Sequence, residues 1–292
     1  MCLDRMVDTN FTLVSGTYAD EQDLLGELDF FLTQTIQGWT QVKVVTDTAS
    51  DKNIAYYSDG SEPGFYDRFW LRIRATSNEL RFNGASLFNP DTDTDSDVFG
   101  GGDNETELPT GTSGGEYWFM ANKDAVHIVV DRLDSSSRHG GFGLWDSYFD
   151  ELEDPKPFYV FGQTAQSQKF TSFRLISYGP HSWGTSYSTL GSGVERAYEA
   201  PHPADIALGT PNPRSGEPKI VEPVFYADGT FRYYEVRGEV PGLYMCGGTG
   251  FDFSDLVTIE STLGTTSGTY FWYKHTDDVC WAIGPVTVSG EV

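Results

Sequence analysis

Four short runs of aromatic and β-branched residues follow one another closely within residues 116–162, and this stretch constrains the fold more than any other. The first two runs are separated only by residues 122–124, a polar connection of the length that closes a β-hairpin. They should therefore pair antiparallel, and the next two runs extend the pairing. The sequence predicts a meander of strands at residues 117–121, 125–132, 142–145 and 158–161.

The second of these runs alternates between two faces. One face carries Val126, Ile128 and Val130, and the opposite face begins with His127. A period of two is expected of a half-buried strand. Residues 135–141, which are polar at first and then rich in glycine, are predicted as the connection to the third run.

Several motifs stand in a fixed order along the chain. They are YWF-x-x-N from residue 117, GFGLWDSYF from residue 141, EDP-x-P and a following aromatic run from residue 153, and two flanking segments at residues 38–40 and 237–244. This order resembles a group of virion structural proteins of tailed viruses, which are either bacteriophages or haloarchaeal viruses. These viruses encode the proteins among their head, neck and tail genes. The resemblance implies a particle subunit that contacts copies of itself and other virion proteins, and it transfers no active residues.

The chain departs from that pattern in an Asp-rich insertion at residues 91–107 and a long connection at residues 179–218. The resemblance therefore leaves open whether the subunit lies at the neck or collar, on the capsid surface or on the tail. Its copy number, symmetry and host stay open as well.

Charge restricts the partners. The 43 Asp and Glu residues against 19 Lys and Arg give a formal net charge of −24 and a pI near 4.3. Such a surface repels phosphate backbones and anionic lipids, so we expect no direct nucleic-acid binding and no membrane binding. Proteins of halophiles share this composition, because molar salt shortens the Debye length to about 3 Å and screens the self-repulsion. A halophilic protein and an ordinary acidic protein with hydrated loops both fit.

The three cysteines are too few for a disulfide framework in a chain of 292 residues. Cys246 and Cys280 fall in predicted strands, where either a bridge or two buried thiols would fit, and Cys2 is left over. No apolar run approaches the ~20 residues that span a bilayer, and the N-terminus lacks the pattern of a signal peptide. We expect a protein made in the host cytoplasm and located in the virion.

Residues 20–34 are predicted as the one helix. Its apolar stripe consists of Leu24, Leu25, Leu28, Phe31 and Leu32. Acidic residues in the first turn complement the helix dipole, and Gly38 can end the helix. Strands at residues 39–45 and 54–57 follow, with a polar turn at 47–53 between them.

Residues 69–75 alternate strictly and predict a strand whose polar face carries Arg72 and Arg74. This basic pair would either bind a ligand carboxylate or form salt bridges with neighbouring acidic side chains. The next segment, residues 80–87, contains the turn signal Asn83-Gly84 and predicts a short hairpin or a connection.

Residues 89–115 are predicted as a long loop, and four alternating aspartates invite a calcium interpretation. The EF-hand template started at Asp91 also uses Asp93 and Asp95, but Ser96 stands where glycine is required and Gly102 where the bidentate glutamate is required. Two interpretations remain: an irregular cation site at residues 91–97, or a hydrated insertion that contacts a neighbouring subunit. Glycosylation acceptor patterns occur at Asn10 and Asn104.

The last third of the chain contains short predicted strands separated by turn residues. Residues 170–178 predict a further strand, and the proline-rich segment that follows marks a domain boundary. Six short strands then predict a small C-terminal β-barrel or sandwich, at residues 224–227, 231–238, 243–246, 256–260, 270–275 and 279–283. The fold class is therefore mostly β: an antiparallel β-sandwich-like domain with one flanking helix over residues 1–185, an irregular connection over 186–218 and an all-β domain over 219–292.

No known catalytic, phosphate-binding or metal-binding motif occurs, and the histidines His127, His139, His181, His202 and His275 are widely dispersed. We therefore expect that the protein is not an enzyme, has no catalytic residues and binds no cofactor or metal. Aromatic residues make up 15% of the chain and fit either subunit interfaces or stacking on sugars. The predicted function is a structural virion subunit that forms a symmetric oligomer. A receptor- or glycan-binding adhesin module is the alternative, and the exposure of Trp118 and Trp145 discriminates between the two.

Overall fold

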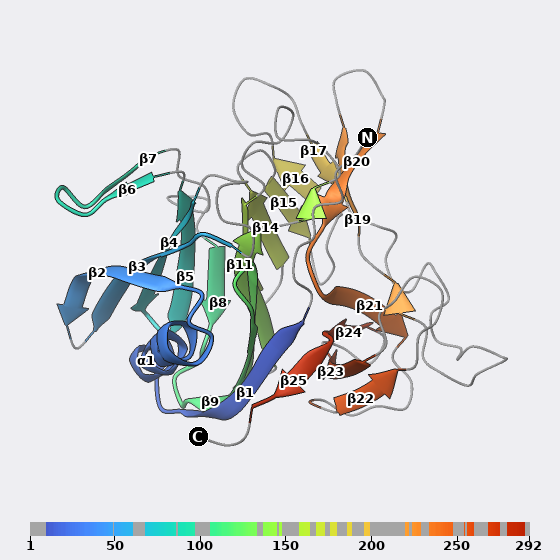
Figure 1. Ribbon diagram of the computed structural model, residues 1–292, viewed down its shortest axis with the longest axis horizontal. Helices are drawn as coiled ribbons and strands as arrows, with labels where there is room; N and C mark the ends of the chain where they lie inside the picture. Colours follow the sequence, from blue (N-terminus) through green and yellow to red (C-terminus); the bar gives the residue numbers. More distant parts are fainter. Residues whose placement is uncertain are drawn as a thin grey trace, which may run out of the picture.

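The computed structural model describes residues 10–48, 50–60, 68–85, 87–96, 106–132, 137–144, 146–147, 158–163, 168–172, 176–179, 186–188, 196–198, 220–221, 224–228, 234–247, 254, 256–259, 268–274 and 279–289. Strands dominate these residues, and one helical segment lies near the N-terminus (Figure 1). The predicted fold class is confirmed, because the chain is mostly β, its sheets are largely antiparallel and sandwich-like, and the helix flanks them.

The largest sheet has nine strands in the order β16-β15-β14-β13-β11-β10-β9-β1-β25. Its members are β1 (Phe11–Tyr18), β9 (Gly115–Ala121), β10 (Ala125–Arg132), β11 (Arg138–Leu144), β13 (Phe158–Gln163), β14 (Gln168–Ser172), β15 (Ile176–Gly179), β16 (Ser186–Ser188) and β25 (Val286–Val288). Strands β9, β10, β11 and β13 pair antiparallel in sequence order, which confirms the predicted meander. Asn122 closes the β9–β10 turn by accepting hydrogen bonds from the backbone N–H groups of Asp124 and Ala125.

Two sequence predictions within this sheet are wrong. Gly140 and Gly141 belong to β11 and pair with β10, where the backbone of β10 approaches so closely that a Cβ on Gly141 would lie 2.3 Å from the carbonyl oxygen of Val126. Residues 170–178 are not one strand. They contribute to two antiparallel strands, β14 and β15, in which Thr171 pairs with Ile176.

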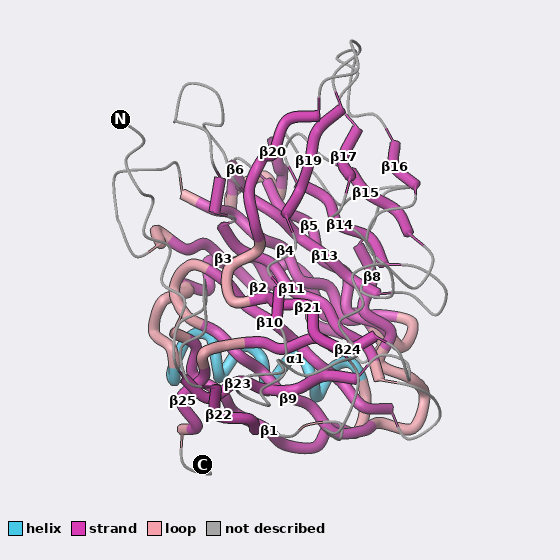
Figure 2. The backbone as a smooth tube through the Cα atoms, turned by 90° about the vertical axis from the view of Figure 1, so that its right-hand side faces the viewer, coloured by secondary structure: helices cyan, strands magenta, loops and turns pink. Residues whose placement is uncertain are grey.

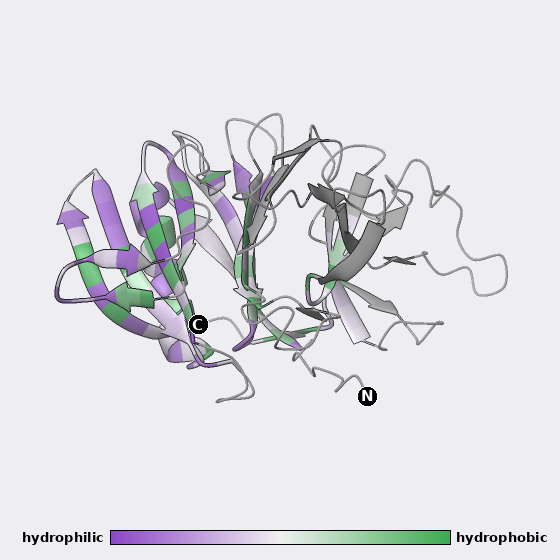
Figure 3. Cartoon of the chain, turned by 90° about the horizontal axis from the view of Figure 1, so that it is seen from above, coloured by the Kyte–Doolittle hydropathy of each residue, from purple (hydrophilic) through white to green (hydrophobic). Residues whose placement is uncertain are grey.

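A second sheet has the order β2-β3-β4-β5-β8. Its strands are β2 (Thr40–Thr48), β3 (Asp51–Ser58), β4 (Phe69–Thr76), β5 (Glu79–Ala85) and β8 (Thr106–Pro109). Seen from above, its strands alternate between hydrophobic and hydrophilic residues (Figure 3). Phe69, Leu71, Ile73 and Ala75 of β4 are buried, as their alternation predicts.

Three predictions in this region need correction. The turn predicted at 47–53 is much shorter, because β2 and β3 extend into it from both sides. Asn83 and Gly84 do not form a turn, because each pairs with a residue of β4 inside β5. The long loop predicted at residues 89–115 contains β8 and part of a two-stranded ribbon, β6 (Leu87–Asn89) and β7 (Thr94–Ser96).

The helix α1 (Glu21–Phe30) continues as a π-helical turn, η1 (Phe31–Thr35). The predicted helix is therefore confirmed, and the π geometry of its last turn is a feature that the sequence did not predict. Asp20 caps it by accepting hydrogen bonds from the N–H groups of Gln22 and Asp23, each 2.9 Å long. The predicted apolar stripe is buried in a core that the helix shares with the second sheet and one face of the nine-stranded sheet. Figure 2 shows the helix among strands.

Two smaller sheets hold most of the C-terminal strands. One has the order β18-β21-β24-β23-β22, and the other has the order β12-β20-β19-β17. Their strands are β12 (Asp146–Ser147), β17 (Arg196–Tyr198), β18 (Ile220–Val221), β19 (Val224–Asp228), β20 (Tyr234–Glu239), β21 (Leu243–Gly247), β22 (Leu256–Ile259), β23 (Gly268–Lys274) and β24 (Val279–Ile283). Backbone register places Cys246 opposite Cys280.

A second core lies between the C-terminal strands and the other face of the nine-stranded sheet. It joins Val129 of β10 and Met120 of β9 to Phe271 and Trp281. The prediction that residues 125–132 form a half-buried strand is therefore wrong, since both faces of β10 are covered over most of its length.

The division into domains at residues 186–218 stays a prediction. Strands from residues 1–185 and 219–292 share two sheets, because β1 pairs with β25 and β12 pairs with β20. The segment predicted as irregular contains the short strands β16 and β17.

Candidate functional site: a groove over strand β1

Strand β1 is paired with β9 over all but its first residue on one side, and over three residues on the other. Against β9 the register runs from Thr12 opposite Ala121 to Tyr18 opposite Gly115. On the other side the parallel strand β25 covers only Phe11 to Leu13. No strand among the described residues pairs with β1 beyond Leu13 on this side, so residues 14–18 form an open edge.

The hydrogen bonds to β25 show which backbone groups face this edge. The N–H of Phe11 donates to the carbonyl of Pro285 (2.9 Å), and the carbonyl of Leu13 accepts from the N–H of Ser289 (3.1 Å). Successive residues of a strand direct their backbone groups to opposite sides. The N–H and C=O of Ser15 and Thr17 therefore point to the open edge, and both residues are exposed.

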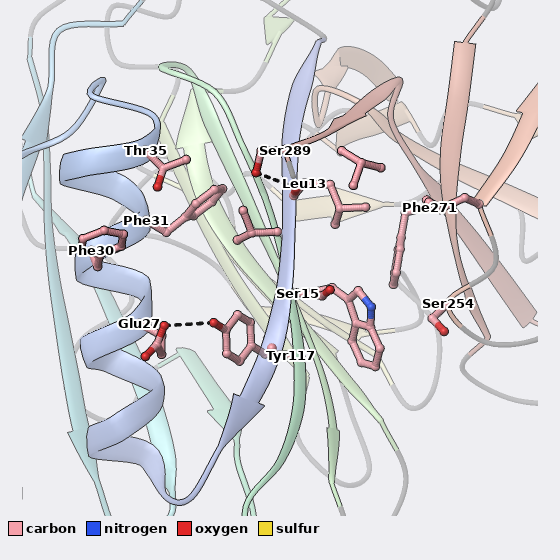
Figure 4. A pocket seen from close by; sticks show the side chains of 15 residues that line it. Leu13, Ser15, Glu27, Phe30, Phe31, Thr35, Tyr117, Ser254, Phe271 and Ser289 are labelled. Atoms are coloured by element: carbon pink, nitrogen blue, oxygen red, sulfur yellow. Dashed lines mark hydrogen bonds between the residues drawn. The ribbon is translucent and has the colours of Figure 1, made fainter. Parts of the chain in front are cut away.

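A groove with a volume of about 740 Å³ opens over this edge (Figure 4). Leu13, Val14, Ser15 and Gly16 of β1 line its floor. The helix forms one wall and the C-terminal sheet forms the other, so β1 lies between two walls from distant parts of the sequence.

The helix wall combines apolar side chains with one acidic group. Phe30 is 52% exposed, and Phe31 and Thr35 lie beside it. The hydroxyl of Tyr117 donates to the carboxylate of Glu27 (3.1 Å). Burial, and then the negative charge of Glu27, raise the pKa of Tyr117 well above its ordinary value, so the phenol stays protonated and holds the carboxylate.

The floor next to that tyrosine requires a residue without a side chain. Gly16 lies opposite Tyr117 in the β1–β9 register. A Cβ at Gly16 would lie 2.6 Å from the Tyr117 hydroxyl oxygen, so a larger residue would clash with the ring. Gly16 thus allows Tyr117 to lie across β1 and reach Glu27.

The opposite wall is formed mainly by Trp118, Ser254, Leu256 and Phe271. Trp118 is half-buried and packs against Phe271 with a ring-centre distance of 5.8 Å. Leu256 is 46% exposed, and Val288 at the end of the groove is 55% exposed. Three of the five large hydrophobic side chains that are exposed among the described residues thus border one groove, which marks a contact surface.

The groove differs from the rest of the chain in charge. Among the described residues that line it, Glu27 is the one that carries a charge, whereas 21% of the residues in the chain are charged. A second molecule can therefore approach this surface with less electrostatic repulsion than a typical acidic part of the protein would impose.

The predicted basic pair on β4 is engaged within the chain. Arg72 contacts Asp95 at 2.7 Å, and Arg74 contacts Asp51 at 2.6 Å, so the salt-bridge interpretation is confirmed. The hydrogen bond from Arg74 lowers the pKa of Asp51. Both arginine charges are therefore compensated by aspartates of the same chain, and no ligand carboxylate is needed to explain them.

The alternating aspartates are divided between different partners. Asp93 forms an ion pair with Lys43 at 2.6 Å, and Asp95 forms the ion pair with Arg72 described above. Asp91 is exposed, and Asp97 lies outside the described residues. Within the part of the chain that the structure describes, no group of three or more His, Cys, Asp or Glu side chains is arranged to hold a metal ion.

Two of the dispersed histidines meet in the core. The Nε2–H of His127 donates to the carbonyl of Pro241 (2.9 Å), which leaves Nδ1 to accept from Nε2–H of His139 (3.3 Å). Burial lowers the pKa of His127 from 6.5 to about 4. His127 is therefore neutral at pH 7, and the sequence gives no sign of this pairing. His181, His202 and His275 lie outside the described residues.

The remaining predicted positions are less informative. Asn10 is exposed, whereas Asn104 and the side chain of Trp145 lie outside what the structure describes. No helix among the described residues is long and apolar enough to cross a membrane. No known protein-family model matches the chain, and no curated protein matches its sequence.

Proposed function

We propose that this protein is a structural subunit of a tailed-virus particle that works by binding other protein chains. The groove over β1 carries the proposal, because exposed apolar side chains on both walls and an unpaired strand edge are features of protein-contact surfaces. The viral part of the proposal rests on the motif order from residue 117 to residue 162, which resembles virion structural proteins.

Assembly with other copies into a symmetric oligomer is part of the proposal and should depend on salt. Each subunit brings a net charge of −24, so association in dilute buffer brings like charges together. At molar salt the Debye length is about 3 Å and the repulsion is screened.

The observation that favours an adhesin is the position of Trp118 in an open groove, since an aromatic ring there can stack on a sugar. Against it, one side of the indole already packs against Phe271. Binding of protein chains therefore accounts for more of the groove than sugar stacking does.

A density map of the intact particle at side-chain resolution tests the function directly. We expect a neighbouring chain to cover Phe30, Leu256 and Val288, with Leu87 as the comparison because it is equally exposed but lies away from the groove. The absence of this chain from the map of the particle would contradict the proposed role as a virion subunit. A peripheral subunit whose groove faces solvent would favour the adhesin.

Sedimentation of the purified protein from about 0.1 M to about 3 M NaCl tests self-assembly. We expect stable oligomers at high salt and loss of assembly or of fold at low salt. A folded monomer at every salt concentration would contradict the symmetric oligomer.

A further inference from the structure

The open edge of β1 lies at the floor of the groove rather than on a flat surface. The helix wall rises on one side and the C-terminal wall on the other (Figure 4). A whole sheet of another globular protein would meet these walls before its own edge reached β1. A single extended segment is narrow enough to enter.

The floor offers such a segment a regular set of hydrogen-bonding groups. Ser15 presents its N–H and C=O groups to the groove, and Thr17 presents its own to the same open edge, two residues or about 6.6 Å further along the strand. Val14, Gly16 and Tyr18 direct theirs to β9. A segment beside residues 14–18 would continue the sheet where its pairing with β25 stops.

The walls suit the side chains of an added strand. Successive side chains of a strand point to opposite faces of its sheet. One set would meet Phe30 on the helix wall, and the other would meet Leu256 and Trp118 on the C-terminal wall. Both sites favour apolar or β-branched side chains.

Charge narrows the choice of occupant. Glu27 is the charged side chain among the described lining residues, and the whole chain carries −24. An acidic segment would be repelled, whereas a neutral or basic segment would be attracted.

From these four features we infer that the groove accepts an extended, neutral or basic segment of a different protein chain, which adds to β1 as a strand along residues 14–18. Strand addition of this kind takes affinity from main-chain hydrogen bonds and selectivity from pockets for alternate side chains. The inference rests on the proposed function for the statement that the protein binds other chains, and it specifies how one such chain binds.

Amide hydrogen exchange of the full chain with a synthetic peptide, KVTVTVK, tests the inference. We expect the peptide to slow exchange at Ser15 and Thr17 while leaving Gly16 unchanged, because the Gly16 amide already faces β9. The matched control is KVTPTVK, whose central proline removes a donor. Equal protection by the two peptides, or none by KVTVTVK, would overturn strand addition.

A pair of variants at one position gives an independent measurement. Thr17→Pro removes the edge N–H, and proline is tolerated on an edge strand where the N–H faces solvent. Thr17→Val keeps the N–H and alters the side chain alone. We expect Thr17→Pro to bind KVTVTVK about tenfold more weakly than Thr17→Val. Equal affinity overturns the inference, and Ser15→Pro against Ser15→Ala repeats the comparison if Thr17→Pro fails to fold.

Two further outcomes concern the occupant. The acidic peptide EVTVTVE is expected to bind at least about tenfold more weakly than KVTVTVK at low salt, and equal binding would overturn the charge preference. Protection of Ser15 and Thr17 in a high-salt oligomer without peptide would identify a second copy as the occupant and overturn the assignment to a different chain. Particle maps in which a folded surface covers the groove without adding a strand would leave the proposed function standing and refute this inference alone.

Discussion

The two faces of the nine-stranded sheet are both buried, but their contents differ. The face toward the helix is filled by apolar residues such as Phe119, Ile128 and Phe142. The face toward the C-terminal strands holds apolar residues as well, but the paired imidazoles of His127 and His139 lie on it, next to Phe161.

This difference separates two kinds of stabilisation within one sheet. Burial of apolar surface does not depend on pH, so the helix-side core should hold equally well across a wide range. A neutral histidine buried against Pro241 must stay uncharged for the other face to remain packed. The attachment of the C-terminal strands should therefore be the pH-sensitive part of the fold.

The largest effect should come from truncating the helix-side core. Phe142 is fully buried and lies edge-on to Trp39, with ring centres 5.2 Å apart. Phe142→Ala is expected to lower the free energy of unfolding by about 3–5 kcal/mol at any pH at which the protein folds. Urea unfolding measures it, with Phe30→Ala as the exposed control, and a loss below about 1 kcal/mol would refute the assignment of Phe142 to a tightly packed core.

The next effect belongs to the opposite face and depends on pH. Because the folded-state pKa of His127 is lowered to about 4 from 6.5, the unfolded chain binds a proton first as the pH falls. Stability is unaffected above pH 6.5, declines as the pH falls toward 4, and is lower by about 3 kcal/mol once both states are protonated.

Urea unfolding of the wild type and His127→Gln over that pH range isolates this contribution. The glutamine amide can still donate a hydrogen bond but does not titrate, so its stability should fall less steeply. His139→Gln is the companion variant, because His139 is the titratable side chain that contacts His127. Identical pH dependence in the wild type and His127→Gln would contradict the contrast between the two faces.

A smaller effect is expected at the start of the helix that covers the apolar face. Asp20→Ala removes the acceptor for the N–H groups of Gln22 and Asp23 and should cost about 1 kcal/mol. Asp20→Asn should retain most of that stability, because asparagine caps about as well as aspartate. Thermal unfolding of the three proteins provides the comparison, and an asparagine variant as unstable as the alanine variant would argue against capping.

The smallest effect should come from the outer surface of the second sheet, which neither core reaches. Arg74 and Asp51 form a partly exposed pair, so Arg74→Gln should change stability by about 0.2–1 kcal/mol. The Arg72–Asp95 pair is more buried, and Arg72→Gln should have the larger effect. Chemical denaturation at low and high salt tests both, since screening should reduce the Arg74 effect further.

Local pattern predicted many of the elements but not what covers them. The helix stripe, β4 and the β9–β10 hairpin depend on neighbours in sequence, and their positions were predictable. The second buried face of β10 depends on strands more than a hundred residues away, which a period of two cannot reveal. Asn83-Gly84 failed as a turn signal because the pairing of both residues with β4 outweighs local preference.

The candidate groove was only partly predictable. Trp118 was identified as a residue whose exposure matters, and it does line the groove. Phe30, Leu256 and Val288 carried no such signal, because they meet only after β1 lies between β9 and β25. The buried His127–His139 contact was hidden for a similar reason, since a polar residue in an alternating strand suggests the solvent face.

The pairing of β1 with β25 also has a consequence in time. Val286 is made about 275 positions after its partner Phe11, an interval of roughly 15 to 55 s at ordinary ribosomal speeds. Throughout that interval β1 lacks its partner β25, and nascent chains on one messenger are crowded together. Arrival of β25 then shields the edge from Phe11 to Leu13, so fewer backbone groups of β1 face a neighbouring nascent chain in the finished molecule than in the growing one.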